Sequence, residues 1–137
     1  MTEVVNPARR DLDTLLVLYQ IYDRHREAVL WFLHGLMAKD YSEYKTKYAG
    51  TSKERVYFTS VCGFFELTGV LVNRRMLSED LFFDVFNPTP FWERAKPIVE
   101  GMRQARPHIY ENFELLSEKR KRWSEKRSPK VRPKMRK

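Results

Sequence analysis

One acidic residue lies in the most apolar part of the sequence. Glu66 is near the middle of residues 53–75, which are otherwise mostly apolar. A carboxylate in such surroundings must find a partner, become protonated or face water. We expect Arg26 to be that partner, because it falls within the apolar face of an N-terminal helix. Thr59 and Asn73 lie seven residues on either side of Glu66 and almost stack with it on a helix. The sequence therefore predicts a polar line of Glu66, Arg26, Thr59 and Asn73.

Two interpretations of this polar line stay open. A Glu66–Arg26 pair would hold the two longest helices in register, as buried ion pairs more often specify packing than perform chemistry. The alternative is a small-ligand binder or an enzyme that uses a cleft near Glu66 and Arg26. Gly63 and Gly69 flank the line and allow either a close helix approach, which we favour, or a small pocket.

The sequence contains no pattern of a familiar enzyme. The motifs GxSxG, GxxxxGK[ST] and GxGxxG do not occur, so hydrolase, NTPase and dinucleotide-binding functions are not predicted. Cys62 has no basic neighbour and is expected to be an inert core thiol. His25 and His34 fall near opposite sides of one helix and cannot share a metal. We therefore expect no catalytic residue, no cofactor and no metal site.

Positive charge is concentrated at the C-terminus. Residues 1–117 hold 15 Lys and Arg against 16 Asp and Glu, whereas residues 118–137 hold 11 against 2. The later segment has too few apolar residues for a core, so we expect a disordered tail. Its cations suit non-specific contact with nucleic-acid phosphates. The candidate residues are Lys119, Arg120, Lys121, Arg122, Lys126, Arg127, Lys130 and Arg132.

Two other roles for the basic segment stay open. It could dock on an anionic membrane surface, where each basic residue contributes about 1 kcal/mol, or it could only keep the protein soluble. A second candidate surface for nucleic-acid bases is the stripe of Tyr41, Tyr44 and Tyr48. We favour core packing for this stripe, because its spacing is that of one buried helix face.

These residues must be positioned by helices. Caps and prolines start helices at Pro7, after Ser78 and after Thr89, and Pro97 is expected to kink one of them. No segment alternates apolar and polar residues between turns, so strands are not predicted. The fold class is all-α: a small bundle of five or six helices over residues 1–117, its last helix reaching about residue 123, followed by the basic tail. The predicted helices cover residues 7–37, 40–48, 53–75, 79–86, 91–106 and 107–123.

Composition sets the broad class of protein. With 137 residues, 42% of them hydrophobic, one folded domain is expected. A single cysteine and an N-terminus without a signal-peptide pattern make the cytoplasm the expected compartment. The apolar stretch 56–72 is short for a membrane span and contains Glu66, so no transmembrane segment is expected. The 19 aromatic residues could also furnish a surface for a homo-oligomer.

Residues 57–77 contain Phe64-Phe65-Glu66 and Gly69 on one apolar helix. This segment resembles a helix of a small prokaryotic family of all-helical proteins of unknown function, and Arg75 stands where the family pattern often has Gly. The resemblance covers about residues 57–116 and implies an all-helical domain, without supplying a catalytic or binding residue. The other matching pieces are Ser78-Glu79-Asp80-Leu81, Phe91-Trp92, Arg103 and Tyr110 to Leu116.

Overall fold

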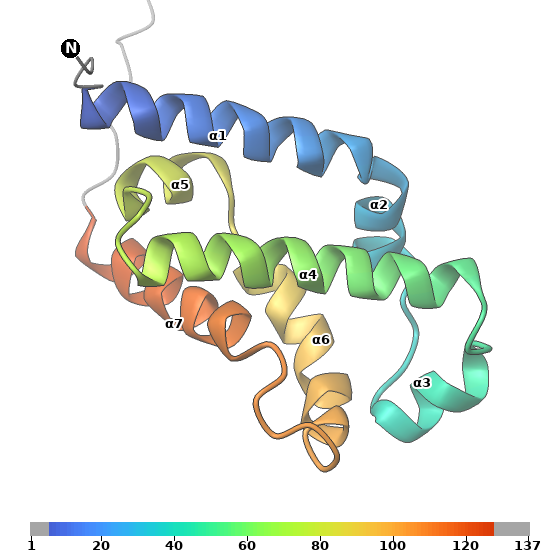
Figure 1. The fold of residues 1–137 in the computed structure, drawn as a ribbon. Coiled ribbons are helices and arrows are strands. Elements are labelled where there is room, and N and C mark those ends of the chain that lie inside the picture. Colours follow the sequence, from blue (N-terminus) through green and yellow to red (C-terminus); the bar gives the residue numbers. More distant parts are fainter. Residues whose placement is uncertain (1–5, 128–137) are drawn as a thin grey trace, which may run out of the picture.

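A computed structural model describes residues 6–127, and these form seven α-helices without a strand (Figure 1). The all-α prediction is confirmed, although the helices number more than the five or six expected. In chain order they are α1 (Pro7–Arg24), α2 (Arg26–His34), α3 (Tyr41–Lys47), α4 (Lys53–Asn73), α5 (Glu79–Val85), α6 (Thr89–Met102) and α7 (Glu111–Lys126).

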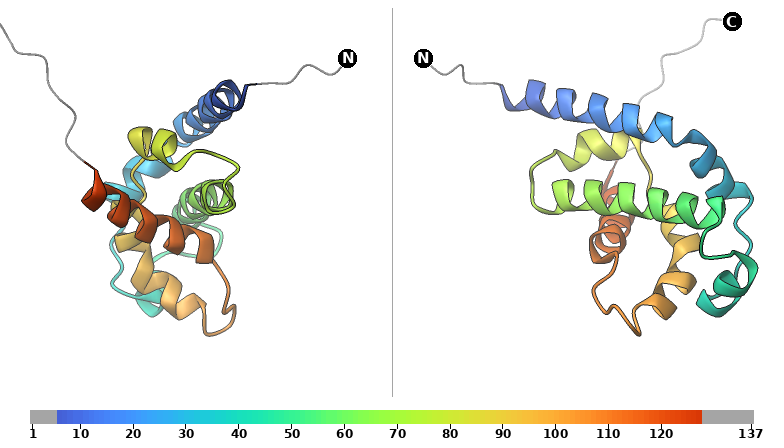
Figure 2. Two further views of the ribbon diagram at one scale, coloured as in Figure 1. Left: turned by 90° about the vertical axis from the view of Figure 1, so that its left-hand side faces the viewer. Right: turned by 45° about the vertical axis from the view of Figure 1, so that its right-hand side comes forward.

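The additional helix arises from a break at His25 in the predicted helix 7–37. The His25 ring Nδ1 lies 2.8 Å from the Ile21 carbonyl oxygen, which the His25 backbone N–H would contact in an unbroken helix. That N–H donates instead to the carbonyl of Tyr22, at 3.1 Å. The chain therefore changes direction at His25, so that α1 runs above α4 and packs on α5, while α2 turns to pack on α4 and α6 (Figures 1 and 2).

Helix α4 lies at the centre of the fold and packs mainly against α2 and α7. Stacked ring pairs join it to both neighbours: Phe58 with Phe32 of α2, at 5.5 Å between ring centroids, and Phe65 with Phe113 of α7, at 5.2 Å. By length and composition alone α4 could cross a membrane. Its inward side chains here form a core. Its N-cap is Ser52, whose hydroxyl accepts a hydrogen bond from the Arg55 N–H.

The tyrosines of α3 are packing residues. Tyr44 and Tyr48 are buried, and the Tyr48 hydroxyl accepts a hydrogen bond from the Met37 N–H at 3.0 Å. Tyr41 packs so closely on α6 that a Cβ added at Gly101 would lie 2.3 Å from the Tyr41 Cβ. The stripe is thus taken up by the core, as we favoured, and does not offer three free rings to nucleic-acid bases.

Helix α7 departs from the prediction at both ends. It begins at Glu111 and not at Pro107, because residues 106–110 form a turn that ends with Tyr110 at φ 58°. It then continues to Lys126, a little beyond the end expected near residue 123. Trp123 explains the continuation, since its ring packs on Phe83 of α5 at 5.5 Å between centroids. Residues 128–137, which include the predicted Lys130 and Arg132, lie outside the described residues.

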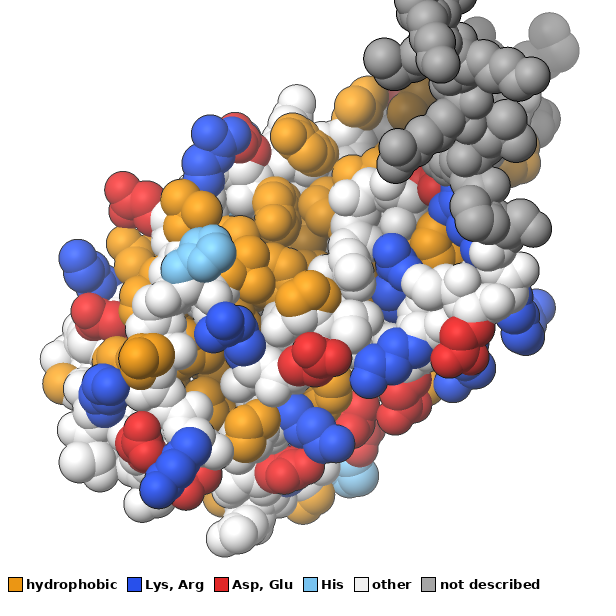
Figure 3. Space-filling view, turned by 180° about the vertical axis from the view of Figure 1, so that it is seen from behind, with side chains coloured by type: hydrophobic (Ala, Val, Ile, Leu, Met, Phe, Trp, Pro, Cys, Tyr) orange, Lys and Arg blue, Asp and Glu red, His pale blue; other side chains and the backbone are white. Residues whose placement is uncertain are grey.

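Helix α1 is the least enclosed helix of the described chain. Its N-terminal end projects past the others in Figure 2. Only Leu15 and Leu18 of this helix are buried, whereas Leu12, Leu16 and Tyr19 remain half-exposed. On the face turned away from the viewer in Figure 1, hydrophobic side chains gather in one area that charged side chains border (Figure 3).

Candidate functional site

The Glu66 carboxylate lies at the start of α7 and not beside Arg26. Its Oε1 accepts a hydrogen bond from the backbone N–H of Phe113 and its Oε2 accepts one from the Asn112 side-chain amide, both at 2.9 Å. The first N–H groups of a helix have no partner within the helix and favour negative charge. Tyr110, at the N-cap position, makes no side-chain capping bond. Glu66 therefore acts as the cap of α7, supplied by another helix.

The predicted pair between Glu66 and Arg26 does not form. Arg26 pairs with Asp23 across the α1–α2 break, and its side chain is 70% exposed. Thr59 is exposed as well, and its hydroxyl donates to the carbonyls of Arg55 and Val56 in its own helix. Periodicity misplaced Arg26 on a buried face, because the break at residue 25 rotates the chain that follows.

Asn73 is the other member of the predicted line that joins Glu66. Its side-chain amide donates to the Oδ1 of Asn112 at 3.2 Å and to the Asn112 carbonyl at 3.3 Å. Gly69 lies between Glu66 and Asn73 in α4, and a Cβ added to it would be 2.4 Å from the Asn112 carbonyl oxygen. The glycine thus permits the close helix approach that we favoured. A Cβ at Gly63, by contrast, would meet no atom within 4 Å.

A second contact fixes the turn before α7. The Arg103 guanidinium donates from Nε to the Ile109 carbonyl at 3.0 Å and pairs with Glu114 at 2.8 Å. It also lies over the Trp92 ring, 5.6 Å from the centroid. Charge patterning alone did not single out Arg103, although Arg103 and Glu114 lie in the segments on which the resemblance to the family rested. In this structure both residues dock α7.

Two titratable groups beside this network are held in their neutral forms. Cys62 is buried, and burial raises the pKa of its thiol well above the usual value, which agrees with an inert core thiol. Burial, assisted by the nearby Cys62 and Glu66, raises the pKa of Tyr110 to about 12. The surroundings of Glu66 are therefore a packed, hydrogen-bonded network that docks a helix.

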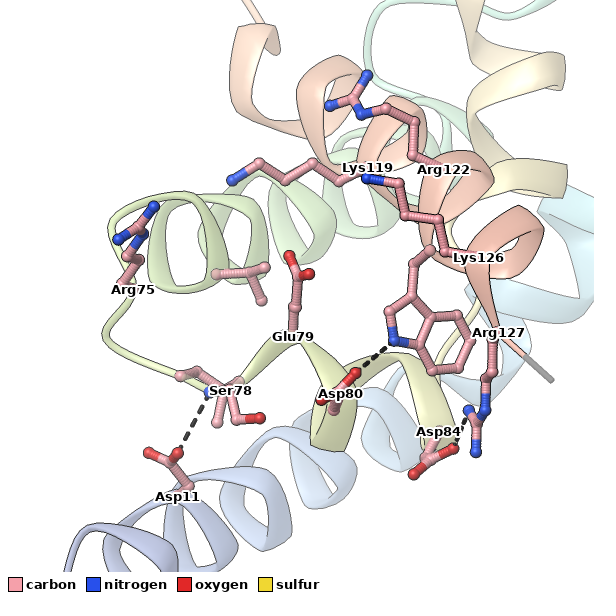
Figure 4. A pocket seen from close by; sticks show the side chains of 13 residues that line it. Asp11, Arg75, Ser78, Glu79, Asp80, Asp84, Lys119, Arg122, Lys126 and Arg127 are labelled. Carbon is pink, nitrogen blue, oxygen red and sulfur yellow. Dashed lines mark hydrogen bonds and ion pairs between the residues drawn. The ribbon is translucent and has the colours of Figure 1, made fainter. Parts of the chain in front are cut away.

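A large groove lies elsewhere, between α5 and α7, and has a volume of about 980 Å³. Glu66 and Arg26 do not line it. One wall carries the cations of α7, where Lys119, Arg122 and Lys126 follow one edge of the helix (Figure 4). Arg75, in the turn after α4, adds a cation on the other side of the groove. The opposite wall is acidic. Its carboxylates are Asp11 of α1 and Glu79, Asp80 and Asp84 of α5.

Three of these carboxylates already have partners. Asp80 accepts a hydrogen bond of 2.6 Å from the Trp123 indole N–H, and Asp84 pairs with Arg127. Asp11 accepts a bond of 3.2 Å from the Ser78 N–H. The contacts of Asp80 and Asp84 dock the end of α7 on α5 and therefore set the width of the groove, and that of Asp11 joins α1 to the start of α5.

The remaining charges of the groove are unpaired. Within residues 6–127 no ion pair involves Glu79 or any of the four cations Arg75, Lys119, Arg122 and Lys126. The acidic and cationic walls face each other across open space (Figure 4). Such a site can bind charged or hydrogen-bonding groups of a ligand without first breaking an internal pair.

The other predicted tail cations have different surroundings. Arg120 lies 4.7 Å from the Trp123 ring centroid and donates to the Ser124 hydroxyl; burial and the nearby Arg127 lower the pKa of Arg120. Arg127 also lies over the Trp123 ring, at 4.4 Å. Lys121 is exposed on a different side of α7. Of the eight predicted phosphate-binding residues, three thus combine as a free cationic edge.

The fold and groove define an all-α domain with a charged cleft formed by its last helix. The chain belongs to the family described as a domain of unknown function, DUF4760, whose model matches residues 8–123. No curated protein and no solved structure matches the chain. The family match extends our expected resemblance to most of the chain. It ends at Trp123, so Lys119 and Arg122 lie within the matched region and Lys126 lies beyond it.

Proposed function

We propose that this protein is a non-enzymatic helical interaction module that binds nucleic-acid phosphates through its basic C-terminal segment. One observation carries the proposal: Lys119, Arg122 and Lys126 follow one edge of α7 and form no ion pair with the described residues. Cations that are not already neutralised can replace the counterions condensed on a phosphate backbone.

The arrangement of these cations suits an extended polyanion. From Lys119 to Lys126 the edge spans about 10 Å of helix at 1.5 Å per residue. Arg75 adds a fourth cation on the other side of the groove. The sequence continues beyond Arg127 with five further Lys and Arg residues and no acid. The charge available to a nucleic acid is therefore concentrated at one end of the chain.

The expected binding is non-specific for base sequence. The only aromatic residue of the basic segment is Trp123, and two guanidiniums lie over its ring while its indole N–H bonds to Asp80. Its faces are thus not free for stacking on bases, which is the usual source of affinity for unpaired bases. Contacts to the phosphate backbone remain, and these carry little sequence information.

Salt-dependent binding to a short DNA duplex tests the proposal. With about six contacts, the slope of log affinity against log salt should be near −5. The triple variant K119Q/R122Q/K126Q should bind more weakly, with a slope less steep by about 3. The matched control R94Q/K96Q/K47Q removes the same charge from exposed positions of α6 and α3. Equal losses from the two triple variants would show that only net charge matters, against the proposal.

Binding to vesicles with and without phosphatidylserine tests the alternative role on an anionic membrane. The groove variant is K119Q/R122Q/K126Q. If it loses vesicle binding but binds the duplex as well as the wild type does, the membrane surface replaces nucleic acid as the partner. If the groove variant loses duplex binding alone, the proposed function is supported.

A further inference from the structure

The groove between α5 and α7 has a second property that non-specific phosphate binding does not use, namely its acidic wall. We infer that this groove binds a phosphate ester that also carries free hydroxyl groups, with the phosphate on the cationic wall and a hydroxyl on Glu79. The inference rests on the proposed function because it uses the same cations. It goes further by specifying the ligand as a phosphate ester with hydroxyl groups.

The two walls are placed to contact opposite ends of one ligand. In Figure 4 Glu79 projects from the start of α5 into the groove, between Arg75 and the cations of α7. The other carboxylates of this wall are occupied by Ser78, Trp123 and Arg127. Glu79 is thus the acid lining the described groove whose side chain has neither a hydrogen bond nor an ion pair within residues 6–127, although the three cations of α7 line the facing side.

The backbone of Arg75 supports a binding role for its side chain. Arg75 has φ 59°, in the left-handed region, and directly follows Arg74, the C-cap of α4. The Met76 N–H donates to the Leu71 carbonyl at 2.8 Å and the Arg75 N–H to the Val72 carbonyl at 3.0 Å, which is the Schellman arrangement. Glycine is favoured at this position because a Cβ makes the left-handed conformation costly.

The arginine side chain does not offset this backbone cost within the described residues. Arg75 is exposed and forms no ion pair there, yet it lines the groove opposite Lys119. A residue that is strained, unpaired and directed into a cavity fits a binding role better than a stabilising one. A guanidinium is also the side chain that best matches a phosphate, with two parallel hydrogen bonds.

The acidic side chain selects among anions. A bare inorganic anion in the groove would be repelled by the Glu79 carboxylate, whereas a hydroxyl can donate a hydrogen bond to it. A phosphate attached to a sugar offers both groups. The volume of about 980 Å³ is at the upper end of small-molecule sites, enough for a ligand the size of a nucleotide. The shared chemistry is a sugar phosphate, which could be free or part of an RNA chain.

Titration calorimetry at low salt tests the inference with ribose 5-phosphate and inorganic phosphate as probes. The wild type should bind ribose 5-phosphate more tightly than inorganic phosphate. Glu79→Ala should weaken ribose 5-phosphate binding about tenfold, the loss of one charge-assisted hydrogen bond, and leave inorganic phosphate binding equal or stronger. If Glu79→Ala strengthens the binding of both probes, Glu79 only repels anions and the inference is wrong.

Arg75 provides a second and independent test. Arg75→Gly should weaken both probes about tenfold while raising the melting temperature by a few degrees, because glycine removes the left-handed strain. The control is Arg74→Ala, a neighbouring exposed arginine outside the groove, which should leave the binding of both probes unchanged. Unaltered phosphate binding by Arg75→Gly would overturn the role assigned to Arg75.

Single-stranded RNA and DNA of one sequence distinguish the sources of the sugar phosphate. Tighter binding of RNA that depends on Glu79 indicates a nucleotide within an RNA chain, since DNA lacks the 2′-hydroxyl. Ribose 5-phosphate binding without polynucleotide binding supports the inference with a free ligand and overturns the proposed function. Salt-dependent binding of RNA and DNA to equal extents, with no binding of ribose 5-phosphate, supports the proposed function and overturns the inference.

Discussion

The Glu66 carboxylate accepts a hydrogen bond from the Phe113 backbone N–H, so a side chain of α4 caps the start of α7. Asn112 and Asn73 extend this contact, and Gly69 lets the two helices approach. The same α7 carries the cationic edge of the groove at its far end. The capping network therefore sets the orientation of the helix on which the proposed binding function depends.

Removing the Glu66 carboxylate is expected to destabilise the fold. Glu66→Ala leaves the Phe113 N–H without a partner and should lower the free energy of unfolding by about 2–3 kcal/mol, whereas Glu66→Gln keeps one acceptor and should cost about 1 kcal/mol. Urea denaturation measures both. Glu93→Ala, at an exposed position of α6, is the control and should stay within about 0.5 kcal/mol of the wild type.

The Glu66 and Arg26 substitutions are expected to be additive. Arg26 pairs with Asp23 and shares no partner with Glu66, so the double variant E66A/R26M should equal the sum of its single variants within about 0.5 kcal/mol. A larger coupling energy in the double-mutant cycle would restore the ion pair that the sequence pattern predicted.

The glycines of α4 should respond to alanine in opposite directions. At Gly69 a Cβ meets the Asn112 carbonyl oxygen at 2.4 Å, so Gly69→Ala must displace the start of α7 and should cost about 1–3 kcal/mol. At Gly63 a Cβ meets open space, so Gly63→Ala should gain about 0.5–1 kcal/mol from the better helix propensity of alanine. Thermal unfolding followed by circular dichroism compares the two. Destabilisation by both variants would contradict the inference that, of these two glycines, only Gly69 lies at a close helix contact.

The sequence predicted the individual helices better than the contacts between them. Caps at Asn6 and Ser78 start helices as expected, because capping depends only on neighbouring residues. The sequence did not predict the break at His25, because a hydrogen bond between a histidine ring and a backbone carbonyl does not change the hydrophobic periodicity.

The candidate site was only partly predictable for a related reason. Glu66 was correctly selected as a carboxylate that needs a partner, but its partner is a backbone N–H, which no sequence pattern specifies. The last helix was expected to run into the basic segment as far as about residue 123, and the contacts of Trp123 with Phe83 and Asp80, which the sequence did not specify, hold it there. The groove depends on how α5 and α7 approach each other, and the spacing of residues along one chain does not encode that approach.

Alkaline pH should destabilise the protein partly through Tyr110. Its pKa is raised to about 12 in the folded state, chiefly by burial, whereas an unfolded tyrosine titrates near 10. The stabilising contribution is therefore complete below about pH 10 and lost as the pH rises through about 12. Denaturation at several pH values between about 9 and 12 should show that the free energy of unfolding declines less for Tyr110→Phe than for the wild type. An identical decline would show that Tyr110 does not titrate in this range.

The end of α7 should contribute to the stability of the domain although it lies in the basic segment. The Trp123 ring packs on Phe83 and its indole N–H bonds to Asp80, so Trp123→Ala removes a partly buried aromatic side chain and a hydrogen bond. We expect a loss of about 2–4 kcal/mol in denaturant unfolding. Lys121→Ala, on an exposed side of the same helix, should stay within about 0.5 kcal/mol. Similar values for the two variants would mean that α7 is not docked beyond Ser117, and the groove would then lose its cationic wall.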